Sequence, residues 1–509
     1  MQGKKHYTEK LFSNFQLSER VPEENFYRQL KQILNLQFLY NQTKKYYGGE
    51  GQKSIDPVVF FKLMLVGYFE NINSDRKIIA HSQLRLDILF FIGYDIDEEL
   101  PWHSTLSRTR QLYGEEIFLQ LFKRVLSLCI DKGMVRGKRQ AIDSAFIKAN
   151  ASLDSLVEKE VIEDAEVYSK ELNANDELKI KTQKKKEINR PDGVKEFMLK
   201  QDDENGKDSH GNLIRPKSLS NETHYSPTDP DARISVKRGK ARHLNYSGQI
   251  AVDDAHHVIT AALAGHADKR DSYWLPCISD QSINNLREKK LQVEQIVADT
   301  GYSSGEALHY LEEINIDGYI PNVGQYKSER EGFIFNKEKN QYECQQGNKA
   351  ILKFKGLNTD SKGNQQKIYR SSETICKNCP LREQCCGKKA KNKNVYDSTQ
   401  KPYYDRMHAK LIKNKLYTKR MKNIRSKTVE PVLGTLINFM NMKRVNTRGI
   451  KQANKHVLMA ALCYNLKKYM KFIQRKTNTK TEQMQINTVL NNNMLAYKEI
   501  SFDISLVNF

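Results

Sequence analysis

Apolar residues recur at intervals of three and four through most of the first 137 residues. The spacing is clear in FYRQLKQILNLQFLY at 26–40 and in IFLQLFKRVLSLCI at 117–130, and it is typical of helices that bury one face. A longer apolar run, VVFFKLMLVGYF at 58–69, contains Lys62 and is shorter than the roughly 20 residues that span a bilayer. The pattern predicts a helical N-terminal domain over residues 1–137, with 58–69 as a core helix.

The segment PWHSTLSRTRQLYG lies between two of these apolar stretches. Pro101 and Ser104 are residue types that favour a helix start. Arg108 and Arg110 would then lie on a short basic helix, which suits a helix-turn-helix DNA reader. An ordinary helical bundle with solvated arginines explains the same residues, and the sequence leaves both alternatives open.

After residue 137 the apolar spacing changes from helical to strand-like. AIDSAFIKANAS at 141–152 predicts a short strand that is broken by Asp143. Alternation in RHLNYSGQIAVDDAHHVITAALAG at 242–265 predicts a hairpin. The remaining elements of the pattern are a helix at 271–293 and strands at 296–299 and 317–323. Strands followed by helices, with a hairpin early, predict a mixed α/β sheet.

Two segments interrupt this sheet domain. Residues 151–228 are charged and poorly periodic, with runs such as KTQKKKEINRPDG, and predict a solvated insertion. Residues 324–400 are rich in lysine and contain five of the eight cysteines. The predicted organisation is a helical domain, a two-part α/β domain, a cysteine-rich insertion and a polar tail. Their boundaries are 1–137, 138–323 with 401–476, 324–400, and 477–509.

The charge balance is strongly basic. Lys and Arg total 83 against 61 Asp and Glu, which gives a net charge of +22 and a pI of about 9.4. Nucleic acid is the commonest partner for such an excess, and a generally solubilised basic surface is the alternative. The first residues, MQGKKHYTEKLFSNF, lack the apolar segment of a secretory signal. We therefore expect a cytoplasmic protein whose cysteines are metal ligands or buried thiols.

Two aspartates lie where predicted strands end. Asp143 ends one short strand and Asp299 ends another, although aspartate is a poor strand former. If both strands are central in one sheet, the two carboxylates meet and offer the hard oxygen ligands that Mg²⁺ or Mn²⁺ prefers. A third carboxylate would complete a two-metal clamp for in-line displacement at a phosphate.

Glu430 is the candidate for this third carboxylate. It lies in IRSKTVEPVLGTLINFM, where Thr428 can cap a helix and Pro431 fits only the first turn. The apolar stripe of this helix would be buried, so Glu430 would point toward the sheet. A glutamate that only stabilises the helix dipole is the alternative.

Four segments resemble the DDE-type insertion-sequence transposases of bacteria, and within them the group named for element 1182. AIDSAFIKANAS resembles the family's first-aspartate strand, DPDARISVKRGK its following basic motif, and VADTGYSSGE its second-aspartate motif. Residues 426–472, which begin SKTVEPVLG and end LKKYMKF, resemble its glutamate helix and C-terminal signature. The resemblance covers most of the chain.

The resemblance implies a fold and a site. The fold is an α/β, RNase H-like mixed-sheet catalytic domain, with the helical N-terminal domain and the cysteine-rich insertion added to it. Asp143, Asp299 and Glu430 carry over as the acidic triad that holds two Mg²⁺ or Mn²⁺ ions. Other aspartates near strand ends compete for these roles, namely Asp253, Asp254, Asp268 and Asp271; for the first two we expect a hairpin-turn role.

The resemblance also implies an activity. The protein would bind the terminal inverted repeats of its own element, cleave the DNA strands and transfer the 3′ ends to target DNA. Two ends must be held together, so a homodimer or larger assembly on double-stranded DNA is expected, in the bacterial cytoplasm at the nucleoid. The alternatives are a stand-alone metal-dependent nuclease and an inactive, domesticated, zinc-stabilised DNA-binding protein.

The sequence departs from the family pattern near the glutamate. Arg425 lies one position too early for the arginine of many relatives, and Ile437 occupies the position of their lysine, so Lys443 or Arg444 is expected to supply the lost phosphate contact. Tyr302 either stacks on a base near the cleaved end or packs beneath its loop. A denser basic run is expected to contact phosphates; it comprises Arg233, Lys237, Arg238, Lys240 and Arg242.

The cysteines of the 324–400 segment have the spacing of a metal site. Cys376 and Cys379 form a Cys-x2-Cys pair, which gives two thiolates the bite that tetrahedral Zn²⁺ requires. Cys344 and Cys385 would close a four-thiolate structural site, with Cys386 as the alternative to Cys385 and free thiols as the alternative to a site. The other three cysteines lie in apolar contexts and are expected to be core thiols; they are Cys129, Cys277 and Cys463.

Overall fold

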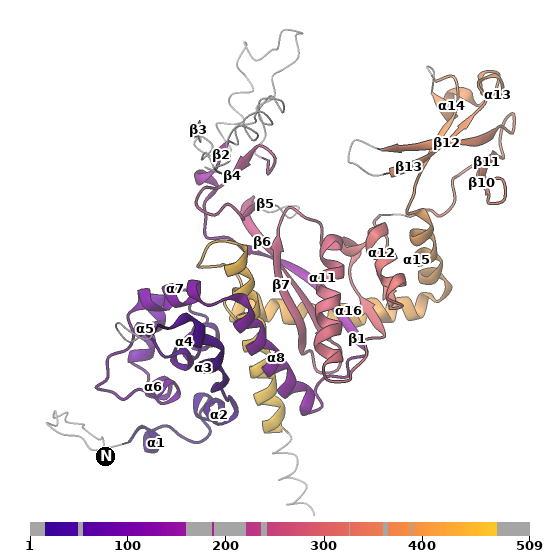
Figure 1. Ribbon diagram of the computed structural model, residues 1–509. Coiled ribbons are helices and arrows are strands. Elements are labelled where there is room, and N and C mark those ends of the chain that lie inside the picture. The colour runs from indigo at the N-terminus through magenta and orange to yellow at the C-terminus, as the bar shows by residue number, and fades with distance from the viewer. Residues whose placement is uncertain are drawn as a thin grey trace, which may run out of the picture.

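The computed structural model describes most of the chain and divides visibly into helices, a central sheet and a separate smaller sheet (Figure 1). The described residues are 16–48, 54–158, 186–187, 220–235, 242–324, 326–359, 365–387 and 390–475. Most of the 151–228 insertion, the whole 477–509 tail, and Lys237, Arg238 and Lys240 lie outside them. Among the described residues, no helix combines the length and the apolar character needed to cross a bilayer.

Helices fill the N-terminal region, as its periodicity predicts. They are α1 (Leu17–Arg20), α2 (Phe26–Ile33), α3 (Phe38–Thr43), η1 (Lys44–Tyr46), α4 (Pro57–Phe69), α5 (Asp75–Gln83), α6 (Leu86–Ile92), α7 (His103–Leu112) and α8 (Glu115–Asp131). Helix α4 buries ten of its residues and is the expected core helix. In α7, Arg108 is exposed, whereas Arg110 is 4% exposed and pairs with Asp75 of α5 at 2.5 Å. Arg110 therefore fastens two helices together and does not face solvent.

The central sheet is mixed, with strand order β5-β6-β1-β8-β9 and β7 paired to β6. Its strands are β1 (Arg139–Lys148), β5 (Arg233–Ser235), β6 (His243–Asp253), β7 (Ile259–His266), β8 (Gln295–Val297) and β9 (Asp317–Tyr319). Strands β6 and β7 form the predicted antiparallel hairpin, and β6 pairs antiparallel with β1. Strands β8 and β9 continue the sheet in parallel with β1. The predicted mixed α/β fold is confirmed.

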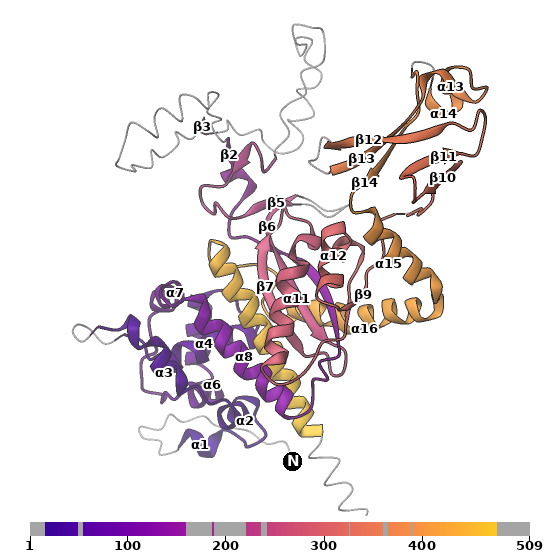
Figure 2. The same ribbon diagram turned by 45° about the vertical axis from the view of Figure 1, so that its right-hand side comes forward.

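Helices cover this sheet and tie it to the N-terminal region (Figure 2). They are α11 (Asp271–Arg287), α12 (Gly305–Glu313), α15 (Lys401–Lys413), α16 (Lys415–Phe439) and a C-terminal helix over residues 450–475. Helix α11 packs on β7 and β6, and α16 packs on β1. One continuous hydrophobic cluster contains buried residues of the N-terminal helices, the sheet and the C-terminal helix. The N-terminal helices therefore share a core with the sheet.

A second sheet stands apart from this core, at the upper right of Figure 1. Its strand order is β10-β11-β12-β13-β14 and all its pairings are antiparallel. Its elements are β10 (Phe333–Asn336), β11 (Gln341–Cys344), β12 (Ile351–Thr359), β13 (Gln365–Ser371), α13 (Glu373–Lys377), α14 (Arg382–Cys386) and β14 (Asn394–Ser398). This sheet unit, residues 326–398, corresponds to the predicted cysteine-rich insertion.

Short elements complete the description. Strands β2 (Val157–Glu158), β3 (Lys186–Glu187) and β4 (His224–Tyr225) form a three-stranded ribbon in the order β3-β2-β4. The remaining single turns are η2 (Leu153–Ser155) and η4 (Thr300–Tyr302). The ribbon and η2 belong to the part of the charged insertion that the structure describes, namely residues 151–158, 186–187 and 220–228.

Three local predictions are wrong. Asp143 lies in the middle of β1 and not at a strand end, because β1 pairs with β6 through residue 148. The helix of Glu430 begins at Lys415, so Pro431 lies inside α16 and Thr428 is a buried interior residue, not a cap. Cys277 is exposed and is no core thiol, because it lies on the outer face of α11, whereas Cys129 and Cys463 are buried.

Candidate active site

Asp143 is held in the centre of the sheet. Its neighbours in β1, Ala141 and Ile142, are fully buried, and its own side chain is 16% exposed. Burial raises the pKa of Asp143 to about 6, and the nearby charge of Asp299 acts in the same direction. The backbone N–H of Ser144, which donates to the carboxylate, opposes this shift in the pKa. A cation bound at this position would stabilise the charged form of the Asp143 carboxylate.

Asp299 reaches the same level of the sheet from the adjacent parallel strand. In the β1–β8 register Ala141 lies beside Val297, so Asp143 and Asp299 each follow that pair by two residues. Strand β8 has ended at this point, and Asp299 instead begins the turn η4 by accepting a hydrogen bond from the N–H of Gly301 at 2.9 Å. The early end of β8 leaves the edge of β1 open where the two carboxylates approach.

Helix α16 brings Glu430 to this site through Arg425. The guanidinium of Arg425 donates to Asp143 Oδ2 at 2.7 Å and to Glu430 Oε1 at 2.9 Å. Arg425 is 18% exposed and Glu430 is 55% exposed, so the bridge lies at the rim of the site. The hydroxyl of Ser426 also donates to Glu430 Oε1, at 2.8 Å. Glu430 therefore lies in the interior of α16, on the side of the helix that faces Asp143.

A fourth carboxylate, Asp271, lies close to the second aspartate. It is the first residue of α11, and its Oδ1 accepts a hydrogen bond from Gln249 Nε2 at 3.0 Å. A methyl group added to Gly301 would lie 3.1 Å from Asp271 Oδ2 and 3.0 Å from Asp299 Oδ1. Both carboxylates therefore lie close to Gly301. The negative charge of Asp271 also contributes to the raised pKa of Asp143.

The other competing aspartates have different roles. Asp253 is buried at the β6–β7 turn, where it accepts hydrogen bonds from the backbone N–H groups of residues 136, 137 and 255. Asp254 pairs with Arg139 at 2.7 Å, and Asp268 pairs with Arg233 at 3.6 Å. The expected hairpin-turn role of Asp253 agrees with these contacts.

Tyr302 is inaccessible to a DNA base. Its ring is 0% exposed, and its hydroxyl donates to Gln249 Oε1. Burial raises the pKa of this phenol well above its usual value, and the charges of Asp271, Asp143 and Asp299 add to that shift in the pKa. Tyr302 packs beneath its loop, which is the second of its two predicted alternatives, because the tight turn after Asp299 directs the ring inward.

The predicted basic contacts differ in availability. Arg233 is engaged by Asp268 and by the carbonyls of Pro230 and Ala232. Arg242, Lys443 and Arg444 are exposed. Arg444 donates to Asn150 Oδ1 at 3.3 Å and lies beside the end of β1. Lys443 and Arg444 lie shortly after the end of α16, the helix that carries Glu430.

The donor set of this site has the right chemistry for a divalent cation. Asp143, Asp299 and Glu430 offer carboxylate oxygens, the ligands that Mg²⁺ and Mn²⁺ prefer. Among the described residues, no three His, Cys, Asp or Glu side chains stand close enough to hold an ion in their present positions. Arg425 explains this spacing at Asp143 and Glu430, because a guanidinium occupies the space between them.

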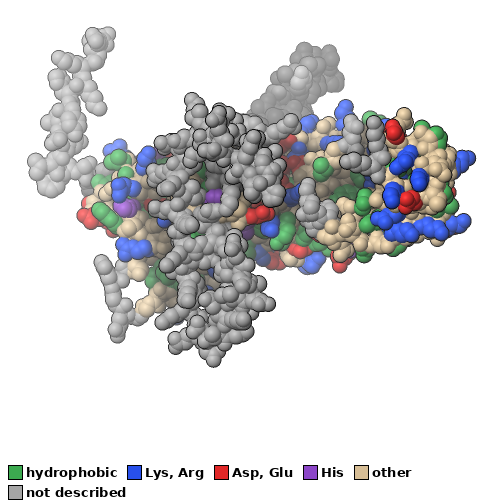
Figure 3. Space-filling model, turned by 90° about the horizontal axis from the view of Figure 1, so that it is seen from above, with side chains coloured by type: hydrophobic (Ala, Val, Ile, Leu, Met, Phe, Trp, Pro, Cys, Tyr) green, Lys and Arg blue, Asp and Glu red, His purple; other side chains and the backbone are tan. Residues whose placement is uncertain are grey.

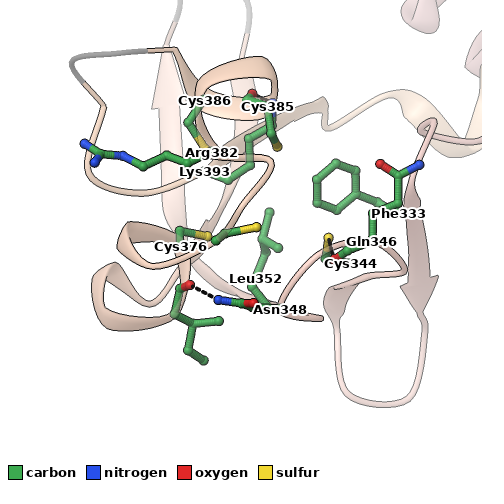
Figure 4. Close-up of a pocket in the computed structure, with 13 residues that line it drawn as sticks. Phe333, Cys344, Gln346, Asn348, Leu352, Cys376, Arg382, Cys385, Cys386 and Lys393 are labelled. Atoms are coloured by element: carbon green, nitrogen blue, oxygen red, sulfur yellow. Dashed lines mark hydrogen bonds between the residues drawn. The ribbon is translucent and has the colours of Figure 1, made fainter.

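A second candidate metal site lies in the sheet unit. All five of its cysteines line one cavity of about 30 Å³, at the end of β11 and against α13 and α14 (Figure 4); they are Cys344, Cys376, Cys379, Cys385 and Cys386. The thiol of Cys376 contacts Ser371 Oγ at 3.0 Å, and that of Cys344 contacts the carbonyl of Gln346 at 3.1 Å. Burial and the neighbouring Cys385 raise the pKa of the Cys386 thiol to about 11.

Sequence reasoning missed Gln249 entirely. It is a fully buried polar residue inside β6, between Gly248 and Ile250, and it contacts both Tyr302 and Asp271. Gln249 shares the polar positions of β6 with Asn245 and Ser247, so the alternation gave no signal that this amide is buried, although an amide is costly to bury without partners. The partners themselves lie 22 and 53 residues away and could not be read from the sequence.

Two family models match separate parts of the chain. A family model described as "Transposase domain (DUF772)" matches residues 15–112, and one described as "Transposase DDE domain" matches residues 343–470. A search of curated proteins finds no match. The solved synaptic complex of piggyBac transposase with hairpin DNA is 10% identical, with 88% of this chain and 74% of that chain covered. Its TM-score of 0.30 is too low to support an inference. The two family matches support a DDE-type transposase of an insertion sequence.

Proposed function

We propose that this transposase binds the terminal inverted repeats of its element, cleaves the DNA and transfers the 3′ ends to target DNA. The observation that carries the proposal is the approach of Asp143, Asp299 and Glu430 to one another where β8 ends beside β1, with Arg425 bridging two of them. The mixed sheet, in which an antiparallel hairpin joins parallel strands, supports the RNase H-like assignment. Membership of the group named for element 1182 stays a prediction.

Asp143, Asp299 and Glu430 would hold two divalent cations, Mg²⁺ or Mn²⁺. When bound, such ions would neutralise the negative charge on the attacking and leaving oxygens of a phosphodiester. Within the chain, Arg425 would withdraw from Asp143 and Glu430 as this site fills. Its planar guanidinium would then be free for a phosphate, which it can bind through two hydrogen bonds.

Exposed basic side chains at the ends of α16 and β6 suit the DNA backbone. Lys443 and Arg444 follow α16, and Arg242 precedes β6. Lys and Arg side chains also gather over the sheet unit, at the right-hand end of Figure 3. A phosphate backbone that ran from α16 toward this unit would meet positive charge at both ends. Synapsis of two ends would require a dimer or larger assembly, which acts in the cytoplasm at the nucleoid.

The sheet unit would be stabilised by zinc. Its separate core has four buried residues among those described, Tyr342, Leu352, Tyr369 and Val395. A core this small rarely stabilises a unit of this size without disulfides or a metal. Five thiols around a cavity of about 30 Å³ offer the soft ligands of a tetrahedral zinc site. Cys344, Cys376 and Cys379 would be joined by Cys385 or Cys386.

The test is strand cleavage and joining in vitro. Purified protein is incubated with Mg²⁺ and DNA that carries the sequences flanking its gene, and both products are scored. Asp143→Asn, Asp299→Asn and Glu430→Gln should each retain DNA binding and lose several orders of magnitude in both reactions. A double variant should be little worse than a single one, because the three groups act as one unit.

Each rival function predicts a different outcome. A stand-alone nuclease would cleave without joining, and an inactive DNA-binding protein would do neither while still binding the ends. Near-normal joining by Glu430→Gln would show that the third carboxylate has been assigned to the wrong residue. Asp254→Asn is the matched control, because Asp254 pairs with Arg139 away from the triad.

A further inference from the structure

The four carboxylates near the active site form two pairs, and the negative charge of each pair is compensated by different groups. Asp143 and Glu430 share the guanidinium of Arg425. Asp299 and Asp271 flank Gly301, and neither has an ion-pair partner among the described residues. Two like charges this close are unfavourable unless a cation or hydrogen-bond donors compensate them. The second pair has one donor to each carboxylate, from Gly301 N–H and from Gln249.

Asp271 is fixed in this position by buried contacts. Gln249 is fully buried and uses its amide nitrogen to donate to Asp271 Oδ1 at 3.0 Å and to Ser247 Oγ at 2.9 Å. Its amide oxygen accepts from the hydroxyl of Tyr302, which belongs to the same turn as Asp299. The chain therefore links the turn of the second aspartate to Asp271 through a single buried side chain.

This arrangement leaves one oxygen of Asp271 available. Oδ1 is occupied by Gln249, whereas Oδ2 lies beside Gly301, a residue that Asp299 Oδ1 also approaches. A Cβ at residue 301 would lie 3.0 Å from Asp299 Oδ1 and 3.1 Å from Asp271 Oδ2, so a larger residue there would require these carboxylates to shift by a few tenths of an ångström. An aspartate at the first position of a helix also stabilises the helix dipole. The dipole alone requires neither the buried Gln249 nor the close approach at Gly301.

We propose that Asp271 is a fourth carboxylate of the cation site, and that it shares with Asp299 in holding a divalent cation. The proposal rests on the proposed function, since it assumes that the triad binds Mg²⁺ or Mn²⁺. In this arrangement Asp143 and Glu430 lie on one side of the cation site, and Asp299 and Asp271 lie on the other. Gln249 is then a positioning residue that aims Asp271, and Gly301 provides the room.

The test measures Mn²⁺ binding to the full chain without DNA, by titration calorimetry and by the Mn²⁺ electron paramagnetic resonance signal. Asp271→Asn should weaken Mn²⁺ binding by at least about 10- to 100-fold, because a change of an outer group that only supports a ligand already costs that much. Asp280→Asn is the matched control. Asp280 lies on the same helix, nine residues or roughly 13 Å further along, and accepts from Tyr310.

Asp271→Glu separates cation binding from helix stabilisation. It keeps a negative charge at the helix start but moves the carboxylate by one methylene. The proposal expects wild-type thermal stability with weakened Mn²⁺ binding. If Mn²⁺ binding is unchanged in Asp271→Glu and Asp271→Asn, while Asp271→Asn alone lowers the Tm, Asp271 serves the helix only and the proposal is overturned.

Asp143→Asn keeps this result distinct from a failure of the proposed function. Loss of Mn²⁺ binding in Asp143→Asn together with unchanged binding in Asp271→Asn would refute the role of Asp271 alone. Absence of Mn²⁺ binding by the wild-type protein would refute both. Gln249→Met should give a smaller loss than Asp271→Asn, because it removes the donor that aims the carboxylate but leaves the carboxylate in place.

Discussion

Arg425 compensates the charges of two carboxylates of the candidate active site. Its bonds to Asp143 and Glu430 make it an internal cation at a site whose acids suit external ones. Both partners lose a charged neighbour if Arg425 moves away. A divalent cation that binds these acids must therefore compete with the guanidinium.

We predict that Arg425→Gln strengthens Mn²⁺ binding by about tenfold, because the competing charge is gone. Titration calorimetry on the DNA-free protein measures this change. Lys422→Gln, an exposed position on the same helix, is the control and should bind Mn²⁺ as the wild type does. Unchanged or weaker binding in Arg425→Gln would show that the bridge does not restrict access to the acids.

His456 is a buried residue that couples stability to pH. Its Nδ1 lies 2.7 Å from the hydroxyl of Tyr68, and burial lowers the pKa of the imidazole to about 4. Between pH 6.5 and 4 the unfolded chain binds a proton at this residue and the folded chain does not. The free energy of unfolding therefore falls as the pH falls through this window.

We predict that His456→Gln removes this contribution. The wild type should lose on the order of 3 kcal/mol more than the variant between pH 7 and pH 4. Urea unfolding at a series of pH values measures the difference, and His309→Gln, which lies on the surface helix α12, is the control. Parallel stability curves for His456→Gln and wild type would contradict the prediction.

At the scale of elements, helix α16 carries the least expected result. It continues unbroken from Lys415 to Phe439, with Pro431 in its interior. Proline cannot donate a hydrogen bond to the carbonyl four residues earlier and usually ends or bends a helix. Packing of Val432 and Leu436 against the sheet region keeps the helix continuous, because both side chains are fully buried. Arg425 and Glu430, which precede the proline, therefore lie on one rigid element.

The DPDAR segment has a structural role. Asp229 is fully buried and accepts from the hydroxyl of Tyr246 at 2.6 Å and from the N–H of Gly449 at 3.0 Å. Asp231 accepts from the N–H of Ile450 at 2.9 Å. The two carboxylates thus satisfy backbone donors at the start of the C-terminal helix, where negative charge is favourable. This anchors the 450–475 helix to the strand β5 side of the sheet.

The sheet unit provides a prediction at the same scale. Cys376→Ser should lower the zinc content of the purified protein from about one ion per chain to none. Because structural zinc binding is largely folding free energy, residues 326–398 should become sensitive to protease while the central sheet persists. Cys277→Ser, an exposed cysteine outside the unit, is the control.

Metal analysis also separates the two candidate fourth ligands. If Cys385 is the ligand, Cys385→Ser loses zinc and Cys386→Ser retains it, and the reverse holds if Cys386 is the ligand. Wild-type protein that contains no zinc when prepared without chelator would exclude the site.

At the scale of the whole molecule, the net charge of +22 predicts binding that depends on salt. Each phosphate that is neutralised contributes about −0.9 to the slope of log K against log salt concentration. We predict a clearly negative slope, and a slope smaller by up to about 2 in the double variant Lys443→Ala/Arg444→Ala. Fluorescence anisotropy on end DNA measures both slopes.

The control for this prediction removes equal charge elsewhere. Lys123 and Lys289 pair with Glu288 and Asp131 where α8 meets the region after α11. Their double alanine variant should keep the wild-type slope. A slope near zero for the wild type would indicate that phosphate contacts do not dominate binding.

The sequence by itself determined the element types and their order. Periods of three to four and of two follow directly from side-chain direction in helices and strands, so the N-terminal helices, the β6–β7 hairpin and the mixed sheet were predictable. The Cys-x2-Cys spacing likewise identified the thiols that line one cavity. Two element boundaries differ from the prediction, because β1 continues past Asp143 and α16 begins at Lys415, well before Thr428.

Only the tertiary structure decided which charged groups meet. The Arg425 bridge joins residues 282 positions apart, and the Gln249 contacts join three separate elements. Such contacts depend on strand register and helix packing, which a linear pattern does not contain. The same packing buried Tyr302 and Arg110, whose sequence contexts were compatible with a role at the surface. Residue types therefore specify which chemistry is available, and the fold specifies where it is assembled.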